Sequence, residues 1–287
     1  MEELLKINNL AVSYDNTTVL NISDMIVYPG DIIGIIGRNG AGKSTLINCI
    51  LNEIKYDGNI ERNFKKKDVG VQFQVNSYND LMKVYELIRI VTKQNKFDSK
   101  LESLIKNFDI TSMLKKKISA LSGGEKQRLT LFLVLYLQPQ IIFFDELTTG
   151  LDYEKRKNML KMVRDYSKGK TVFTVTHYFD EIENWATKLL ILNKGNPIFW
   201  GAPDELKELY PHYGVLKIAK SFKSDEFTVI KDENDDSSLI IVKDREEQIK
   251  AIDVLNKLNI EFEARTCNIY SLYTLLMNDQ NKEVQHA

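Results

Sequence analysis

The 287-residue sequence is short of the features that mark several large classes of protein. Its two cysteines, Cys49 and Cys267, lie far apart in apolar segments, so we expect free thiols and a reducing compartment rather than a disulfide scaffold. The formal net charge is −1, which gives no global reason to expect nucleic acid as a partner. The first residues have no basic region followed by an apolar one, so no signal peptide is expected.

Long apolar runs are scarce as well. The most hydrophobic stretch, Leu129 to Phe144, is interrupted by Gln138, Pro139 and Gln140. A stretch this short and broken does not suit a membrane span, so we expect any membrane role to go through another chain. The sequence also contains no internal repeat and no low-complexity tract.

What the sequence does contain is an alternation of apolar runs with helical patterns. We predict strands at 4–10, 21–27, 31–36, 141–144 and 171–176, and helices at 43–53, 124–137 and 154–166. Continuous apolar strands that alternate with helices indicate a parallel sheet covered on both faces. The sequence therefore predicts an α/β protein.

Two further regions differ from this pattern. Residues 81–117 carry helical periodicity, with Leu101, Leu104, Ile105 and Phe108 on one face, which predicts a helical subdomain. From about residue 210 we predict a hairpin (226–231 with 239–243), an amphipathic helix through Ile249, Ile252, Leu255 and Leu258, a strand (260–265) and a last helix from Tyr270. The predicted domains are thus residues 1–210, with the helical subdomain at about 78–135, and an α/β appendage at 211–287.

A glycine-rich loop predicts a phosphate site. Residues 37–44, Gly-Arg-Asn-Gly-Ala-Gly-Lys-Ser, fit G-x-x-x-x-G-K-[ST] between an apolar strand and a helix. Glycines let backbone N–H groups wrap closely around phosphate oxygens, and the helix N-terminus favours negative charge. Lys43 would neutralise the β- and γ-phosphates, and Ser44 would offer its hydroxyl to Mg²⁺.

A pair of acidic residues follows the apolar strand at 141–144. Asp145 would lie at the carboxyl edge of the sheet beside the phosphate loop, where it could hold Mg²⁺ directly or through water. Glu146 is a candidate general base for the attacking water. Two acids at a strand end are often only solvated, so this pattern gains its weight from the phosphate loop.

Residues 121–128, Leu-Ser-Gly-Gly-Glu-Lys-Gln-Arg, resemble the signature motif of ABC (ATP-binding cassette) ATPases, in a variant with Glu at the fifth place. An ordinary Ser helix cap would explain the helix start but not the motifs around it. The resemblance covers residues 3–210. It implies an ABC-type P-loop NTPase domain: a RecA-like parallel sheet core, an antiparallel β subdomain and a helical subdomain, followed here by the C-terminal α/β appendage.

The resemblance also implies roles for single residues. Tyr14 would stack on adenine, Gln74 (with Gln72 as a nearby competitor) would be the Q-loop glutamine that contacts Mg²⁺ or water, and His177 would bond the γ-phosphate. Asp152, in Thr-Gly-Leu-Asp at 149–152, would belong to the D-loop. The implied catalytic residues are Lys43, Gln74, Glu146 and His177; the implied Mg²⁺ ligands are Ser44, Gln74 and Asp145; the implied ATP contacts are Tyr14, Gly37, Asn39, Gly40, Ala41, Gly42, Lys43, Ser44, Thr45, Ser122, Gly123, Gly124 and Asp152.

Members of this family work in pairs, so the resemblance implies a second ATPase protomer. Ser122 and Gly124 of one protomer would complete the phosphate site of the other, head to tail, in a homodimer or a heterodimer. A separate integral membrane permease would dock near Asn76, Tyr78, Leu81 and Tyr85, which places the chain at the cytoplasmic face of the membrane. One departure from the family pattern is Leu147, where a proline is usual after the catalytic Glu; the D-loop backbone gains freedom, and no reacting group is lost.

The transported substrate is the least determined part of this interpretation. The segment 193–206 and the Ser271-Leu272 pair in the last helix resemble bacterial exporters of drugs and antimicrobial peptides, so export is our first hypothesis. An importer ATPase is one alternative. A soluble ABC ATPase that acts on ribosomes or DNA is another, although only one cassette and no long coiled coil occur here.

Overall fold

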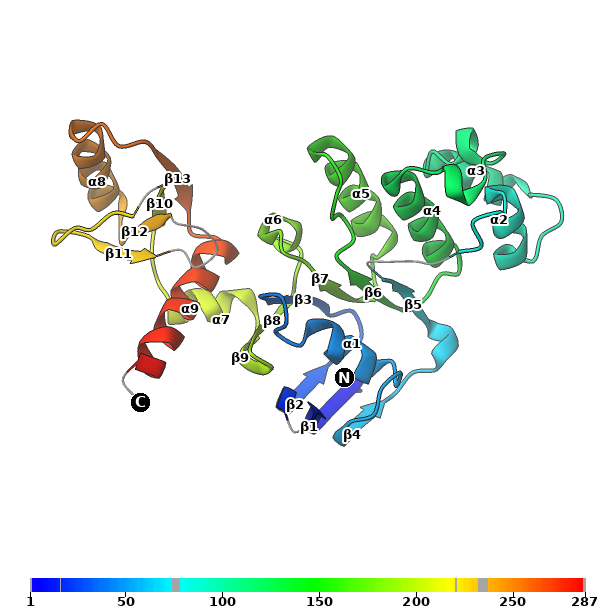
Figure 1. Ribbon diagram of the computed structural model, residues 1–287, viewed down its shortest axis with the longest axis horizontal. Helices are drawn as coiled ribbons and strands as arrows, with labels where there is room; N and C mark the ends of the chain where they lie inside the picture. Colours follow the sequence, from blue (N-terminus) through cyan, green and yellow to red (C-terminus); the bar gives the residue numbers. More distant parts are fainter. Residues whose placement is uncertain (1, 16, 74–77, 220, 232–236, 286–287) are drawn as a thin grey trace. The chain divides into compact units, whose positions relative to one another are not determined.

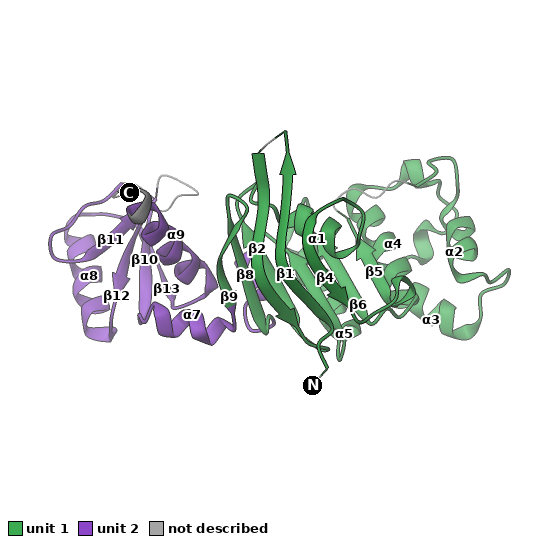
Figure 2. Ribbon diagram, turned by 90° about the horizontal axis from the view of Figure 1, so that it is seen from below, with its two compact units in different colours: residues 1–177, 186–200 green, residues 178–185, 201–287 purple. Residues whose placement is uncertain are grey.

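The computed structural model describes residues 2–15, 17–73, 78–219, 221–231 and 237–285, and the chain forms two compact units. Unit 1 comprises residues 1–177 and 186–200, and unit 2 comprises residues 178–185 and 201–287 (Figure 2). The domain boundary predicted after residue 210 stays a prediction. None of the helices in the described ranges is long and apolar enough to cross a membrane.

The centre of unit 1 is a six-stranded sheet with the order β5-β6-β7-β3-β8-β9. The first five strands of this order are parallel neighbours. Their residues are largely buried and apolar, as expected for strands that are covered on both faces. The bounds are β3 (Ile32–Gly37), β5 (Val69–Gln72), β6 (Ile141–Asp145), β7 (Thr171–Val175), β8 (Lys188–Asn193) and β9 (Asn196–Gly201). This sheet confirms the predicted fold class.

A second, antiparallel sheet packs in the same core. Its order is β2-β1-β4, with β1 (Leu5–Tyr14), β2 (Thr17–Val27) and β4 (Asp57–Arg62). Helix α1 (Lys43–Ile50) contacts both β2 and β3 and buries Leu46 and Ile47 between the sheets (Figure 1). Cys49 lies in this core as a free thiol, and burial raises its pKa to about 11.

Helices cover the opposite face of the central sheet. Gly70 of β5 approaches Val134 of α4 (Gly123–Tyr136), whereas Val69 and Val71 pack in the core around α1. Because side chains alternate along a strand, α1 and α4 lie on opposite faces (Figure 1). The remaining helices of this part are α2 (Val84–Thr92), α3 (Ser99–Asn107) and α5 (Tyr153–Tyr166). The predicted helical face is confirmed: in the α3 region Leu101, Ile105 and Phe108 are buried and Leu104 is half-buried.

Unit 2 is built on an antiparallel sheet with the order β11-β12-β10-β13. Leu216 and Ile240 pack with Leu255 of the helix α8, while Val215 and Ile241 pack with Tyr270 of the helix α9. The sheet therefore has one helix on each face. The bounds are α6 (Phe179–Ile182), α7 (Pro203–Leu209), β10 (Gly214–Ile218), β11 (Thr228–Lys231), β12 (Ser238–Val242), α8 (Arg245–Lys257), β13 (Phe262–Thr266) and α9 (Ile269–Gln285). The predicted hairpin, helix, strand and last helix are confirmed, but the central strand β10 was not predicted.

A buried hydrogen-bond cluster fixes the start of α9. The Ser271 side chain is fully buried; its Oγ lies 2.9 Å from His212 Nε2 and donates to the Asn268 carbonyl at 2.8 Å. The same Oγ accepts from the Asn268 backbone N–H at 3.1 Å. Each of these groups would lose a partner if the hydroxyl were removed.

We predict that Ser271→Ala lowers the free energy of unfolding by about 1–3 kcal/mol, because it removes a partner of the part-buried Asn268 N–H and of His212 Nε2. Urea unfolding followed by circular dichroism measures this change. Asn256→Ala, at an exposed position on α8, is the control and should leave the free energy within about 0.5 kcal/mol. Equal stability of both variants would contradict a structural role for the cluster.

Candidate functional site

The phosphate loop joins β3, the strand between β7 and β8, to the N-terminus of α1. Gly37 has no room for a side chain, because a Cβ there would lie 2.5 Å from the Leu192 carbonyl oxygen. Gly40 has a φ of +80°, and a Cβ on it would meet nothing within 4 Å, so the backbone here faces open space. A glycine loop before a helix N-terminus is the arrangement that binds a phosphate through backbone N–H groups.

The Lys43 side chain contacts the backbone at the start of this loop. Its ammonium group donates to the carbonyl oxygens of Gly37 at 2.7 Å and Arg38 at 3.0 Å, and the residue is only 7% exposed. Burial lowers the pKa of Lys43, while the nearby carboxylates Glu146 and Asp145 raise it to a smaller extent. The loop thus holds a positive charge where a phosphate would arrive.

Asp145 lies at the carboxyl end of β6, opposite the start of α1. Ser44 Oγ donates to Asp145 Oδ2 at 3.2 Å, so a hydroxyl and a carboxylate meet at the phosphate loop. Burial raises the pKa of Asp145, Glu146 adds to that rise, and the Ser44 hydrogen bond together with Lys43 and His177 opposes it. Hydroxyl and carboxylate oxygens are ligands that suit Mg²⁺. Within the described ranges no group of three or more His, Cys, Asp or Glu residues could hold a metal by itself.

Glu146 and His177 meet at the same edge of the sheet. His177 Nε2 lies 2.8 Å from Glu146 Oε1, and Thr149 Oγ1 donates to Glu146 Oε2 at 3.3 Å. The Glu146 backbone is in the left-handed region, with a φ of +52°, and its N–H donates to the Val175 carbonyl at 3.0 Å. A glutamate held this way at a strand end is a candidate general base. The sequence did not predict the Thr149 contact.

A hollow of about 540 Å³ brings most of the predicted residues together. Tyr14, 55% exposed at the end of β1, lies on its wall, as an aromatic residue that stacks on a base would. Val19 is an apolar wall residue that the sequence did not predict. The full lining is Tyr14, Val19, Asn39, Gly40, Ala41, Gly42, Lys43, Ser44, Thr45, Glu146 and His177. Gln74 lies outside the described residues, and its competitor Gln72 is buried and does not line the hollow.

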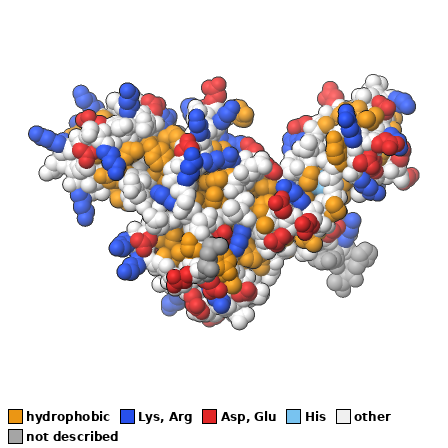
Figure 3. All heavy atoms as spheres, turned by 180° about the vertical axis from the view of Figure 1, so that it is seen from behind, with side chains coloured by type: hydrophobic (Ala, Val, Ile, Leu, Met, Phe, Trp, Pro, Cys, Tyr) orange, Lys and Arg blue, Asp and Glu red, His pale blue; other side chains and the backbone are white. Residues whose placement is uncertain are grey.

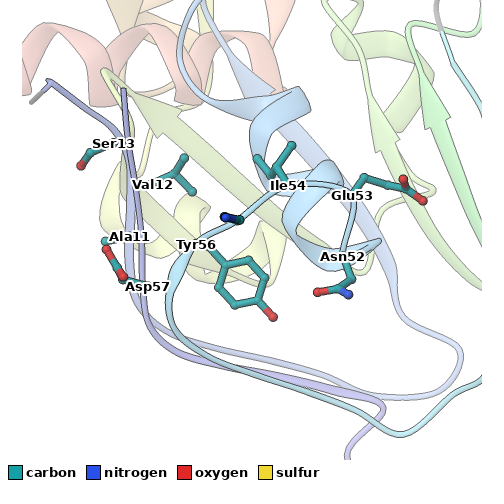
Figure 4. A pocket seen from close by; sticks show the side chains of 9 residues that line it. Ala11, Val12, Ser13, Asn52, Glu53, Ile54, Tyr56 and Asp57 are labelled. Carbon is teal, nitrogen blue, oxygen red and sulfur yellow. The ribbon is translucent and has the colours of Figure 1, made fainter. Parts of the chain in front are cut away.

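A larger hollow, of about 750 Å³, lies between β1 and the chain that connects α1 to β4 (Figure 4). Its charged side chains are Glu53, Lys55 and Asp57, so its lining carries a net negative charge. Glu53 is already paired with Lys66 at 3.3 Å. This hollow does not suit a polyphosphate, whereas the phosphate-loop hollow does.

The signature residues do not line the phosphate-loop hollow. Ser122 caps α4: its Oγ accepts from the Glu125 N–H at 3.3 Å, and its own N–H donates to Glu125 Oε2 at 2.8 Å. The Glu at the fifth place thus completes a capping box. Ser122, Gly123, Gly124 and Asp152 are all absent from the lining of that hollow. Asp152 instead caps α5, where its side chain accepts from the Lys155 N–H at 3.0 Å.

The D-loop is tied to the signature helix within the same protomer. Gln127 Nε2 donates to the Thr149 carbonyl at 3.0 Å. The Leu151 side chain packs beside Gly124, where an added Cβ would lie 3.1 Å from Leu151 Cδ2. Leu147, which replaces the usual proline, is buried. Its side chain therefore contributes to packing in this segment.

The predicted permease contacts separate into two kinds. Leu81 is 75% exposed, as a docking residue would be. Tyr78 is only partly accessible, and its hydroxyl donates to Thr130 Oγ1 of α4 at 2.8 Å. Burial raises the pKa of Tyr78, and the bond to Thr130 opposes that rise. Tyr85 is half-buried and bonds Glu86 at 3.0 Å, and Asn76 lies outside the described residues.

Comparisons with known proteins identify the family of this chain. Residues 20–149 match the family described as "ABC transporter". The "Energy-coupling factor transporter ATP-binding protein EcfA" of Malacoplasma penetrans is 31% identical, over 79% of this chain and 89% of the relative. The "Methionine import ATP-binding protein MetN" of Clostridium acetobutylicum is 27% identical, over 98% of this chain and 95% of the relative. The "Nod factor export ATP-binding protein I" of Rhizobium etli is 30% identical, over 69% of this chain and 68% of the relative.

A solved structure supports the same fold. The protein titled "Structure of ATP binding subunit of ABC transporter" superposes with a TM-score of 0.64 and 23% identity, over 72% of this chain and 93% of that one. The identity to EcfA, over most of that protein's length, carries the family assignment. The chain therefore belongs to the ABC transporter family, as an ATP-binding subunit that hydrolyses ATP.

Proposed function

We propose that the chain binds ATP with Mg²⁺ in the phosphate-loop hollow and hydrolyses it to drive a membrane transporter. The observation that carries this proposal is the meeting of Lys43, the Ser44–Asp145 pair and the Glu146–His177 pair at one edge of the central sheet. Backbone N–H groups from Gly40 to Thr45 and the Lys43 ammonium group bind the phosphates, and Tyr14 stacks on the adenine.

The metal site is proposed for Ser44, Asp145 and Gln74, the last of them from the sequence resemblance. Ser44 Oγ and Asp145 Oδ2 lie 3.2 Å apart and supply the oxygen ligands that Mg²⁺ prefers. When bound, Mg²⁺ neutralises charge on the β- and γ-phosphate oxygens. Burial of Asp145 strengthens its attraction to a cation, because the surroundings screen the charge less than water does.

Glu146 takes a proton from the attacking water. Oε1 of Glu146 faces His177 Nε2 at 2.8 Å, and the Thr149 hydroxyl donates to Oε2. The same Nε2 cannot bond both Glu146 and a γ-phosphate. We therefore expect ATP to draw His177 to the γ-phosphate and leave Oε1 available to the water, while Thr149 keeps the carboxylate oriented.

The signature residues act on a second protomer. Ser122, Gly123 and Gly124 lie at the N-terminus of α4, outside the hollow of their own chain, and a helix N-terminus suits a phosphate. Asp152 joins the same seam through the D-loop. We propose a head-to-tail dimer, most simply with a second copy, in which each α4 N-terminus completes the other's ATP site.

The transporter component that crosses the membrane is proposed to be a separate permease chain, with this chain on the cytoplasmic face. Leu81, beside α2, supplies an exposed apolar contact for it. No nucleic-acid partner is expected. Lys and Arg side chains are interspersed with Asp and Glu on the face shown in Figure 3, which presents no field of one sign to a polyanion.

Two directions of transport each have an observation in their favour. Export of amphipathic or antimicrobial peptides, or of drugs, is supported by the sequence of residues 193–206, and one relative is named for Nod factor export. Import is supported by the alignment of a relative named for methionine import over 98% of this chain, which includes both units. Relatives named for tungstate uptake and zinc uptake also match, over 67% and 71% of this chain.

We predict that Glu146→Gln lowers the ATPase rate by about 10²–10⁴-fold while ATP still binds, because only the proton acceptor is lost. Steady-state phosphate release measures the rate. Size-exclusion chromatography with ATP should show a dimer that persists in this variant. Glu146→Gln combined with Ser122→Arg should stay monomeric with ATP, and a dimer in that double variant would contradict the head-to-tail arrangement.

We predict that Asp145→Asn raises the Mg²⁺ concentration needed for half-maximal hydrolysis by about 10- to 100-fold, because a neutral amide attracts the cation less strongly. A titration of ATPase rate with Mg²⁺ tests this. Asp204→Asn, at an exposed carboxylate of unit 2 that pairs with Lys207, is the control. An unchanged Mg²⁺ requirement in Asp145→Asn would argue against the proposed metal site.

The direction of transport is tested in a strain that lacks the chain and is complemented with either the natural sequence or Glu146→Gln. Export predicts that both the deletion and the Glu146→Gln strain become several-fold more sensitive to amphipathic cationic peptides, while the natural sequence restores resistance. Import predicts unchanged sensitivity and a loss of uptake of radiolabelled methionine, zinc or tungstate. Loss of neither property would contradict both candidates.

A further inference from the structure

A third hollow, of about 430 Å³, lies at the edge of the central sheet opposite the phosphate loop. Gln140 on its wall directly precedes β6, and Lys170 directly precedes β7. Asp145 and His177, by contrast, stand at the far ends of these same two parallel strands. The hollow is therefore separate from the ATP site, and its volume is within the range of small-molecule sites, about 300–1,000 Å³.

The wall of this hollow is aromatic. The rings of Phe108 and Phe132 are both buried and meet edge to face, with centroids 5.6 Å apart. The ring centroid of Tyr166 lies 5.1 Å from that of Phe108, and the ring centroid of Tyr136 lies 6.1 Å from that of Phe132. Leu104 of α3 adds an aliphatic contact. Tyr136 and Tyr166 are half-buried, so their rings offer the hollow an apolar surface that suits a flat apolar group, while Phe108 and Phe132 support them from the core.

The polar part of the lining carries an excess of positive charge. Lys100 and Lys170 contribute two ammonium groups, and among the described residues neither forms a salt bridge. The only lining carboxylate, Asp165, is already paired with Lys168 at 2.9 Å. Burial lowers the pKa of Lys170, which is the effect expected for an ammonium group with no anion beside it.

We propose that this hollow binds a small aromatic carboxylate, whose ring packs against Tyr136, Tyr166 and Leu104 while its carboxylate pairs with Lys170 and Lys100. The apolar wall and the two ammonium groups each select one part of such a molecule. Lys170 forms no salt bridge among the described residues; Lys100 forms none either, but it lies near the carboxylate of Asp98. An anion would remove the cost of leaving Lys170 partly buried without a partner. The lining comes from α3, α4, the C-terminal end of α5 and the segments that precede β6 and β7, so a bound ligand would join these parts of unit 1.

The test is calorimetric titration of the full-length protein, without nucleotide, using 2-naphthoate and its neutral analogue 2-naphthamide. Both probes share the bicyclic ring, so their difference reports the charge. We expect 2-naphthoate to bind at least about tenfold more tightly than 2-naphthamide, because only the carboxylate can form charge-assisted hydrogen bonds with the lysine ammonium groups. No heat of binding for 2-naphthoate, or equal affinity for both probes, would overturn the proposal.

Variants locate the site. Lys170→Gln should weaken 2-naphthoate binding about tenfold and leave 2-naphthamide unchanged, because only the ammonium group is lost. Leu104→Trp should fill the hollow and abolish binding of both probes. Lys250→Gln, on the exposed surface of α8 in unit 2, is the matched control and should bind like the natural protein. Binding of 2-naphthoate that survives both Lys170→Gln and Leu104→Trp would place the ligand elsewhere and refute the assignment.

The ATP site is measured separately in the same samples. Lys170→Gln and Leu104→Trp leave every residue of the phosphate-loop hollow in place, so both should bind ATP like the natural protein. If ATP fails to bind while 2-naphthoate binds as expected, the proposed function falls and this inference stands. If ATP binds as expected while 2-naphthoate does not, the inference about the aromatic hollow is refuted and the proposed function stands.

Discussion

The register of three parallel strands is the constraint on which the site depends. Val175 of β7 pairs with Ile35 of β3 and with Asp145 of β6, so the three strands leave the sheet at one edge. The phosphate loop, Glu146 and His177 follow directly from these ends. A slip of one residue would move a side chain by about 3.3 Å and turn it to the other face, which would separate Glu146 from His177.

Packing between the strands stabilises this register. Phe143 of β6 and Phe173 of β7 are buried neighbours whose rings stack 4.6 Å apart, and they occupy paired positions in the register. A register slip would break this stack and expose apolar surface, at a cost of roughly 25 cal/mol for each Å². The catalytic geometry therefore depends on residues that never contact a nucleotide.

The sequence predicted the parts of the site whose residues are adjacent in the chain. The residues from Gly37 to Ser44 and the pair Asp145–Glu146 each form a contiguous motif, and their strand context followed from apolar runs. Contacts between distant segments could not be predicted, because nothing local in the sequence encodes them. Examples are the Gln127 side chain on the D-loop and the Tyr78–Thr130 bond, which turns a predicted docking residue toward α4. Strand β10 was not predicted, because a largely apolar run of five residues does not by its periodicity distinguish a strand from a buried helix segment.

Helix α4 connects the two proposed binding sites of unit 1. Its N-terminus carries Ser122, and its C-terminal turn contributes Phe132 and Tyr136 to the aromatic hollow. A helix of 14 residues is about 21 Å long. A ligand that holds one end of α4 against the C-terminal end of α5 would therefore also bear on the position of Ser122, the residue proposed to meet the partner's phosphate. Since Gln127 bonds the same helix to Thr149, and Thr149 bonds Glu146, this one helix links the proposed dimer seam, the proposed catalytic base and the aromatic hollow.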